Sequence, residues 1–372
     1  MKKILNKVIR PTFVIRSILI TTCMAGLFST LKAQDPHFSQ FYSAPIYINP
    51  ALAGQNGKGS LNLNSRQQWT NLNSTLFSNS LSADHFLPKY NSSIGVILNY
   101  HQEDLLNLIS FDIGTVYSYS LKINETLNFR AGLQASYFVR DANFSNLIFG
   151  DQLDITTGTT NPNSQENLEG IDKKIGNVSF STGGMLYRKK HRRRNRNIGA
   201  NQGDWWVGTA FHHINEPNQS IIENGNDDLS LKMAIQTGIV LSSKKGPSDA
   251  RTTASDYLER SWTFIANWKK QRNFSQLDLG LQYFWEPILL GINYRGMPTK
   301  NLEGITNQES LILIVGVDLS LNTTVGFSHD FPISKLSGES GGSSEISLSL
   351  AFSLSSKPSR KRVKTERVCA KR

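Results

Sequence analysis

Alternation between apolar and polar residues constrains the fold of this chain more than any other feature of its sequence. From residue 126 to residue 140, apolar side chains at the odd positions alternate with mostly polar side chains, and residues 109–124, 274–285 and 345–354 repeat the pattern. Successive residues of a β-strand point to opposite faces, so each stretch predicts a strand with one apolar and one polar face. We therefore expect an all-β fold.

Two architectures have strands of this kind. A soluble sandwich buries the apolar faces between two sheets, whereas a transmembrane barrel turns them towards lipid. The predicted strands, about 9–15 residues long, exceed the roughly 5–6 residues usual in soluble sheets and suit a tilted membrane-spanning strand. Aromatic residues also lie at the expected strand ends, as in the interfacial girdles of outer-membrane barrels. These residues are Trp69, Tyr100, Trp205, Trp262, Trp268, Trp285 and Tyr294. The barrel is the favoured prediction.

We predict a transmembrane antiparallel β-barrel of about 14 strands over residues 59–354. The strands are expected to centre near residues 64, 81, 97, 116, 133, 182, 208, 236, 265, 279, 291, 315, 326 and 350, and the second and seventh have the weakest patterns. An even strand number is typical of a closed single-chain barrel. A barrel of this size can enclose a lumen that is either open or plugged.

Residues 1–33 have the pattern of a signal peptide. A positively charged beginning precedes the apolar residues 17–28, and a small residue, Ala33, predicts cleavage before Gln34. The apolar run is too short for a membrane-spanning helix. A lipoprotein anchored at Cys23 is an alternative, but residues 20–22 make a poor lipobox. Leader removal leaves Cys369 as the single cysteine, so we expect neither an intrachain disulfide nor a cysteine-based metal site.

The formal net charge of +11 is distributed unevenly along the chain. The leader, residues 188–196 and the tail at 355–372 are strongly basic, whereas the remainder carries an excess of acidic residues. Basic clusters also occur in nucleic-acid-binding proteins. A secreted chain rarely meets nucleic acid, so we expect no nucleic-acid partner.

Loop lengths predict how the barrel lies in the outer membrane. If both termini are periplasmic, the tight turns at 124–125, 286–287 and 321–322 also face the periplasm, as in other outer-membrane barrels. The long acidic segments 141–177 and 215–228 then face outwards. Residues 296–309 and 331–344 are expected to form further long outer connections.

The same orientation places the basic run at 188–196 and the basic tail on the periplasmic side. The centre of the basic run is Arg192, Arg193 and Arg194. A concentrated positive patch of this kind attracts acidic partners. We therefore predict a docking surface for periplasmic proteins. A solvated loop and tail, or contact with anionic outer-membrane lipid, are the alternatives.

Candidate catalytic groups are few. His212 and His213 are neighbours on a predicted strand and so point to opposite faces. The pairs Asp84–His85 and His329–Asp330 would suit a hydrolase only if His and carboxylate side chains met at the outer rim. The sequence lacks the Gly-x-Ser-x-Gly motif of serine hydrolases. We expect a non-enzymatic protein without metal or cofactor.

An irregular segment, residues 34–58, precedes the first predicted strand. Pro36, Pro45 and Pro50 favour an extended chain, and its aromatic residues suit anchoring to a wall or a partner. The segment is expected either to pack in the lumen as a plug or to contact a partner directly. The candidate partner-binding residues are Asp35, Pro36, His37, Phe38, Gln40, Phe41, Tyr42, Asn49 and Pro50.

Residues 34–54, QDPHFSQFYSAPIYINPALAG, resemble the beginning of the PorP/SprF family of outer-membrane proteins from the type IX secretion and gliding machinery. Weaker similarity continues at Tyr117–Tyr119, Gly150–Leu153, Val207–Asn218 and Gly342–Leu350. The basic tail beyond Leu354 departs from a barrel that ends on its last strand.

The resemblance implies a function in type IX protein secretion. Its expected partners are periplasmic and outer-membrane components of that system and a large secreted surface protein or adhesin, which the protein would help to export or attach. An outer-membrane barrel that transports solutes, passively or specifically, remains the alternative.

Overall fold

The computed structural model describes a barrel and the segment that precedes it. The described residues are 35–72, 75–104, 107–142, 150–154, 159–160, 174–188, 204–221, 225–245, 258–302, 305–333 and 340–353. The short helices of the N-terminal segment are η1 (Phe41–Ser43), α2 (Pro45–Ile48) and η2 (Pro50–Leu52). Two further short helices, η3 (Pro88–Tyr90) and η5 (Gly150–Gln152), lie in connections. The chain divides into two compact units, Met1–Asp35 and Pro36–Arg372, and the second contains the barrel.

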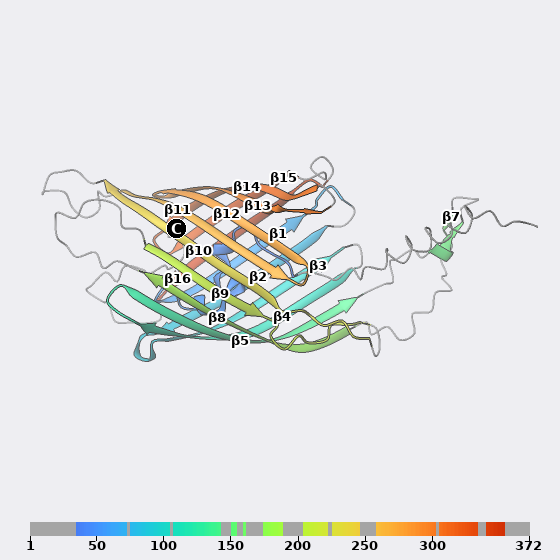
Figure 1. The fold of residues 1–372 in the computed structure, drawn as a ribbon, viewed down its shortest axis with the longest axis horizontal. Helices are drawn as coiled ribbons and strands as arrows, with labels where there is room; N and C mark the ends of the chain where they lie inside the picture. The colour runs from blue at the N-terminus through green and yellow to red at the C-terminus, as the bar shows by residue number, and fades with distance from the viewer. Residues whose placement is uncertain are drawn as a thin grey trace, which may run out of the picture. The chain divides into compact units, whose positions relative to one another are not determined.

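Fourteen antiparallel strands form the closed barrel, in the order β1-β16-β15-β14-β13-β12-β11-β10-β9-β8-β5-β4-β3-β2 (Figure 1). Their bounds are β1 (Gly59–Gln68), β2 (Leu76–Leu87), β3 (Ser92–Glu103), β4 (Leu108–Lys122), β5 (Leu127–Ala142), β8 (Lys174–Arg188), β9 (Asp204–His212), β10 (Lys232–Lys245), β11 (Leu258–Gln271), β12 (Phe274–Trp285), β13 (Ile288–Leu302), β14 (Ile305–Ser320), β15 (Thr323–Pro332) and β16 (Ser343–Phe352). A separate two-stranded sheet pairs β6 (Leu153–Asp154) with β7 (Thr159–Thr160).

The predicted fold class and strand number are confirmed. Every expected strand centre lies within one of the barrel strands, including the two weakest, in β2 and β9. One connection differs from the expectation of a long outer loop at residues 296–309. There β13 continues to Leu302 and β14 begins at Ile305, with shifts of register after Arg295 and after Met297. Local bulges extend this hairpin although the sequence alternates imperfectly.

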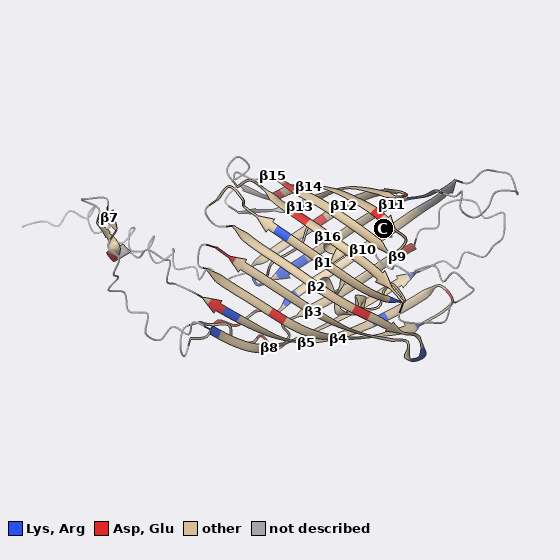
Figure 2. Ribbon diagram, turned by 180° about the vertical axis from the view of Figure 1, so that it is seen from behind, with Lys and Arg blue, Asp and Glu red and all other residues tan. Residues whose placement is uncertain are grey.

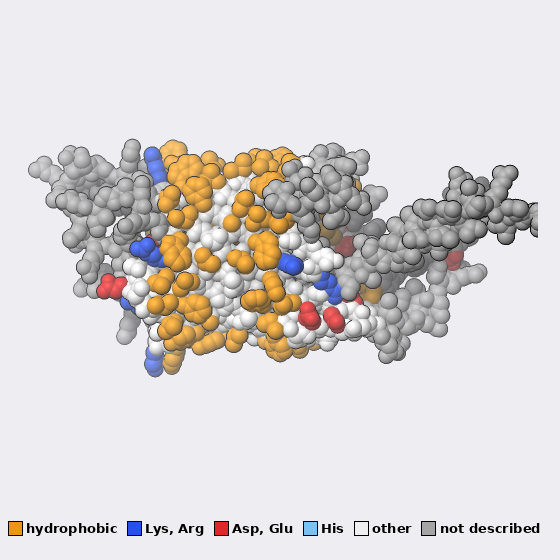
Figure 3. Space-filling model, viewed as in Figure 1, with side chains coloured by type: hydrophobic (Ala, Val, Ile, Leu, Met, Phe, Trp, Pro, Cys, Tyr) orange, Lys and Arg blue, Asp and Glu red, His pale blue; other side chains and the backbone are white. Residues whose placement is uncertain are grey.

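The barrel wall is apolar outside and polar inside. On β1, Asn62, Asn64 and Arg66 face the interior and are buried, whereas the outward Leu63 is exposed. Figure 3 shows the apolar side chains as a belt across the visible face of the barrel, with charged side chains towards its two ends. Charged residues are sparse along the strands themselves (Figure 2). Lipid solvates such an outer face, so the alternation that sequence reading detected is a transmembrane pattern.

Among the described residues, no helix has the length and apolar character needed to cross a membrane.

Candidate functional site

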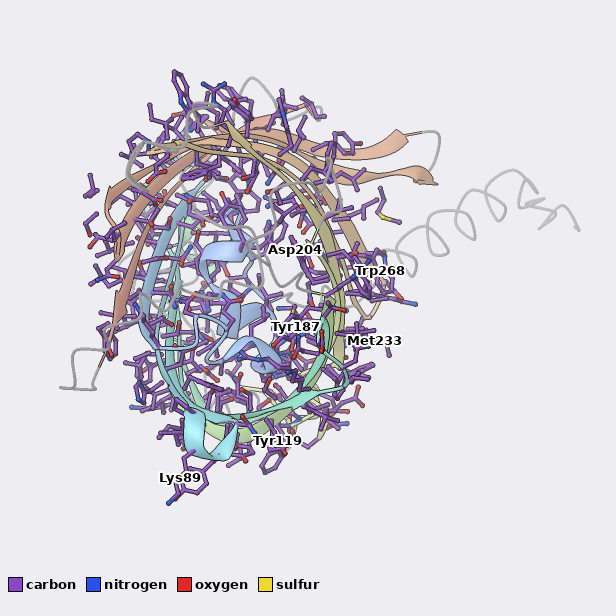
Figure 4. All side chains as sticks on the ribbon, turned by 90° about the vertical axis from the view of Figure 1, so that its left-hand side faces the viewer. Lys89, Tyr119, Tyr187, Asp204, Met233 and Trp268 are labelled. Carbon is purple, nitrogen blue, oxygen red and sulfur yellow. The ribbon has the colours of Figure 1, made fainter. Side chains whose placement is uncertain are left out.

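The N-terminal segment lies inside the barrel and runs along its lumen. Seen down the barrel, its short helices are enclosed by the ring of strands, while Lys89 lies outside the ring (Figure 4). Ser39 bonds to Glu345 near the beginning of β16. Gly54 bonds to Asp84, which pairs with Ser60 at the opposite end of the barrel. From Ser39 to Gly54 the segment thus runs along the lumen towards the end of the barrel that contains Phe352.

Asn49 is the central anchor of this segment. Its side-chain oxygen accepts the Ala51 N–H at 2.9 Å and caps η2, because a helix leaves its first N–H groups without internal partners. Its Nδ2 donates to the carbonyls of Gly184 and Thr209 at 3.3 and 3.1 Å. The same Nδ2 also lies 3.2 Å from Gln236 Oε1. One buried amide therefore joins the segment to β8, β9 and β10.

Two glycines of the wall make room for this anchor. A Cβ at Gly132 would lie 2.6 Å from Ala51 Cα, and a Cβ at Gly183 would lie 2.9 Å from Asn49 Cγ. Side chains do not tolerate such distances, so the Asn49-Pro50-Ala51 turn needs glycine on the facing strands β5 and β8. The segment and the wall fit closely at this level.

A second anchor lies near the barrel end that contains Phe352. The Arg130 guanidinium donates to the carbonyls of Ala53 and Gly54, both at 3.0 Å. Ser118 Oγ donates to the Ala53 carbonyl at 2.8 Å, and Asp84 accepts the Gly54 N–H at 2.6 Å. Gly54 has φ +71°, a left-handed conformation that favours glycine. Buried backbone groups of the turn thus find partners on β2, β4 and β5.

The third anchor lies in the other half of the barrel and involves the wall's charged residues. Glu345 accepts the backbone N–H groups of Ser39 and Gln40 at 2.6 and 3.1 Å. Ser39 Oγ donates to Asp330 at 2.7 Å and accepts from Arg66 and Arg295. Each buried charge thereby gains a polar partner, which a buried charge requires.

Apolar packing fills the space between these anchors. Phe41 and Leu52 pack with Met185, Tyr187, Trp206 and Ile265, whereas Ile46 and Ala53 pack with Ile97 and Val116. On the opposite wall Tyr42 packs against Phe284, Leu289, Ile312 and Ile314. The aromatic residues that the sequence presented as anchors are therefore bound to the barrel's own wall.

His37 lies near the beginning of the described segment in a cationic environment. Burial, followed by the positive charges of Arg295, Lys269, Arg66 and Lys232, holds the pKa of His37 well below its usual value. The imidazole is therefore neutral at physiological pH. Close by, Tyr47 Oη donates to the Pro36 carbonyl at 2.5 Å and the Tyr47 ring packs on Phe38.

The inward side chains of the wall beside the segment are buried as well. Inward side chains of β11, β12 and β13 are as deeply buried as the segment itself: Thr263 is 3% exposed, and Gln282 and Asn293 are each 1% exposed. Water-filled pores of larger barrels expose such polar inward residues. In the part of the chain that the structure describes, the wall encloses packed protein.

The predicted partner-binding residues have different positions. Phe38, Gln40, Phe41, Asn49 and Pro50 are buried in the lumen, whereas Pro36, His37 and Tyr42 are partly buried there. Asp35 belongs to the first compact unit. Arg192, Arg193 and Arg194 lie outside the described residues, as do the proposed signal peptide and the basic tail from residue 355.

Sequence reasoning missed the wall residues that hold the segment: Arg66, Asp84, Arg130, Arg295, Asp330 and Glu345. Their signal was present, because each is a charged residue on the polar face of an alternating strand. A charge that faces a narrow lumen needs a partner there, but the pattern does not say which one.

The histidine side chains that are neighbours in the sequence have separate partners in the structure. His212 Nε2 lies 3.0 Å from the Ile48 carbonyl, while His213 Nδ1 lies 2.8 Å from Ser179 Oγ. His329 faces outwards beside Ser344, whereas its neighbour Asp330 is bonded inside the lumen. The described residues also contain no group of three His, Cys, Asp or Glu side chains that could hold a metal ion.

An antiparallel barrel with an apolar belt and a packed interior defines a class, the plugged β-barrels of outer membranes. A family model described as "Type IX secretion system membrane protein PorP/SprF" matches residues 30–350. The chain belongs to this family, as the match spans most of its length, and the family implies an outer-membrane component of type IX secretion.

Other comparisons add only a general likeness. No curated protein sequence matches the chain. The toluene transporter TbuX of Ralstonia pickettii is 10% identical, with a TM-score of 0.40, over 83% of this chain and 94% of that one. CymD, a monoaromatic hydrocarbon channel, is 12% identical, with a TM-score of 0.40, over 84% and 93%. BamA from Haemophilus ducreyi is 9% identical, with a TM-score of 0.37, over 79% and 70%. Likenesses this loose carry no argument about function.

Proposed function

We propose that this protein is a non-enzymatic scaffold of the type IX secretion machinery, which docks periplasmic partners and helps to export or attach a large surface protein such as an adhesin. The filled lumen is the observation that favours a scaffold over a pore. A segment that fills the barrel leaves its rims, loops and outer wall as the surfaces that partners can reach.

The surfaces for docking follow from this burial. Phe38, Gln40, Phe41, Asn49 and Pro50 hold the segment to the wall and are inaccessible to a protein outside it. Direct contact by the segment is therefore limited to its partly buried residues, such as those around Pro36 and His37 and those at 56–58. We assign periplasmic docking mainly to the basic run around Arg192–Arg194 and to the basic tail, where concentrated positive charge attracts acidic surfaces.

The direct test is recovery of the tagged protein from gently solubilised outer membranes, with its partners identified by mass spectrometry. We expect periplasmic components of the secretion system, or one very large surface protein, to be recovered with it. Recovery of the barrel alone would contradict the scaffold. A general secretion component and a partner of one adhesin differ in which of these proteins is recovered.

A second test separates scaffold from transporter. The full chain in a planar lipid bilayer should show no steady conductance. A variant in which residues 44–57 are replaced by a glycine–serine linker of equal length keeps Ser39 and Gln40 and should conduct. A variant lacking the tail after residue 354 is the control, because it leaves the lumen filled. Steady conductance of the full chain, or facilitated uptake of a solute by vesicles that contain it, would favour the transport barrel.

Charge reversal tests the basic run. Replacing Arg192, Arg193 and Arg194 by glutamate should reduce partner recovery and weaken its dependence on salt, because exposed charge interactions are screened within about 10 Å at 0.1 M salt. Replacement by lysine keeps the charge and is the matched control. Equal recovery of both variants would indicate a solvated loop without a docking role.

A further inference from the structure

The segment contacts the one pair of neighbouring strands in the barrel that is distant in sequence. The barrel closes where β1 meets β16, and in that register Arg66 lies opposite Glu345. Every other pair of neighbouring strands consists of barrel strands that are consecutive along the chain. By contrast, β1 and β16 are the first and last barrel strands. Closing the longest loop of a chain has the largest entropic cost, so this seam depends most on additional contacts.

Ser39 and Gln40 provide such contacts to both strands of the seam. On β16, Glu345 accepts both of their backbone N–H groups, and Ser347 Oγ donates to Gln40 Oε1 at 2.8 Å. Gln40 Nε2 also donates to the Glu345 carbonyl at 3.1 Å. On β1, Arg66 donates to Ser39 Oγ. Two adjacent residues of the segment thus bridge the seam from inside.

A chain of ion pairs extends this bridge along the wall. Arg66 pairs with Asp330 at 2.8 Å, Arg295 joins Asp330 to Asp278 at 2.8 Å each, and Lys269 pairs with Asp278 at 3.2 Å. Arg66 is 3.6 Å from Glu345, a longer separation than the others. The closest partners of the Glu345 carboxylate are therefore the N–H of Ser39 and, at 3.1 Å, the N–H of Gln40 and Asn64 Nδ2.

The other anchors tie the same segment to earlier strands. Asn49 bonds to β8, β9 and β10, and the Ala53–Gly54 turn bonds to β2, β4 and β5. The segment therefore connects strands from the first part of the barrel with β15 and β16 at its end. Without it, the buried Glu345 carboxylate loses two donors, a loss that costs more when the group is charged.

We propose that the N-terminal segment has a function beyond filling the lumen: Ser39 and Gln40 clamp the β1–β16 seam, so that barrel closure depends on a seated segment. Lumen filling and clamping make different predictions. A filler that loosens weakens the wall wherever it packed, whereas a lost clamp weakens β1 and β16 specifically.

The test is amide hydrogen exchange of the full chain in lipid nanodiscs, which reports local opening. The double variant Ser39→Ala/Gln40→Ala removes the side-chain bonds to Arg66, Ser347 and the Glu345 carbonyl. It keeps the two backbone N–H groups that the Glu345 carboxylate accepts, and it keeps the central and second anchors. It should exchange at least about tenfold faster in β1 and β16, since tenfold corresponds to losing about one or two net hydrogen bonds. Strands β3, β4 and β5 should keep their protection. Asn49→Ala is the control and should accelerate exchange in β8 and β9 but not at the seam.

Two results would overturn the clamp: unchanged exchange at the seam, or equal acceleration in all strands. If the double variant does not assemble, the clamp is tested by adding Ser65→Cys and Ile346→Cys to that variant, together with Cys369→Ser. The two new cysteines can then form a disulfide across the seam. These residues are paired across the seam, away from the segment's contacts, and paired positions suit a disulfide. Oxidation should restore a compact barrel that shifts on heating in gel electrophoresis. Failure of the disulfide to restore it would refute the clamp.

Discussion

Gly183 offers a direct test of how closely the segment fits the wall. Gly183→Ala adds a single methyl group that would lie 2.9 Å from Asn49 Cγ and 3.2 Å from the Thr209 carbonyl oxygen. Either the methyl group strains the wall or Asn49 moves away and loses its bonds to Gly184, Thr209 and Gln236. Overpacking costs about 1–3 kcal/mol and each net hydrogen bond about 1 kcal/mol. We expect the free energy of unfolding to fall by about 3 kcal/mol.

The neighbouring glycine provides a matched control. Gly184→Ala would place its methyl group 3.6 Å from the Phe129 ring, an ordinary contact on the outer face. Both variants reduce the freedom of the unfolded chain equally, by about 0.4–1 kcal/mol, so this contribution cancels in the comparison. The difference between the two variants therefore isolates the contact with Asn49.

Urea unfolding in lipid vesicles, followed by tryptophan fluorescence, measures this difference. The midpoint should decrease for Gly183→Ala with an unchanged slope, because the same surface is exposed on unfolding. A difference below about 0.5 kcal/mol between the variants is within the usual effect of a surface substitution. Such a result would refute the close fit of the Asn49 turn in its glycine socket.

Three further predictions concern the segment. Asn49→Ala should lower the free energy of unfolding by about 2–4 kcal/mol in the same urea assay, as it removes a helix cap and an amide group that donates to acceptors on three strands. Asp84→Asn should lower the temperature at which the folded band disappears in gels, because the amide turns a donor towards Gly54 N–H or Ser60 Oγ; an unchanged temperature would contradict this anchor. His37 has a lowered pKa in the folded state, so the unfolded chain binds the proton first and stability falls as the pH drops below the ordinary value of 6.5. Between pH 7.5 and 5.5 we expect the free energy of unfolding to fall, and His37→Asn should abolish this fall; equal losses in both proteins would show that other groups titrate.

The sequence by itself determined the strands and the class of fold. Alternation located the centre of every barrel strand, weakly for β2 and β9, because a wall one residue thick between lipid and lumen imposes a period of two. The density of prolines and aromatics in residues 34–58 also predicted an irregular segment with a plug among its readings. Strands and irregular turns follow from local chemistry, which a sequence displays directly.

Only the tertiary structure decided where the segment lies and what holds it. Glu345 and Ser39 are 306 positions apart, and nothing in the local pattern of either residue identifies the other. The segment's aromatic residues suit a wall and a partner protein equally well. In the structure they contact the wall: Phe41 packs with Met185, and Tyr42 packs against Phe284. An alternating strand specifies that a charge faces inwards, but its partner depends on strand order, register and closure. These are properties of the whole barrel, because each inward charge meets the lumen only once all strands have paired.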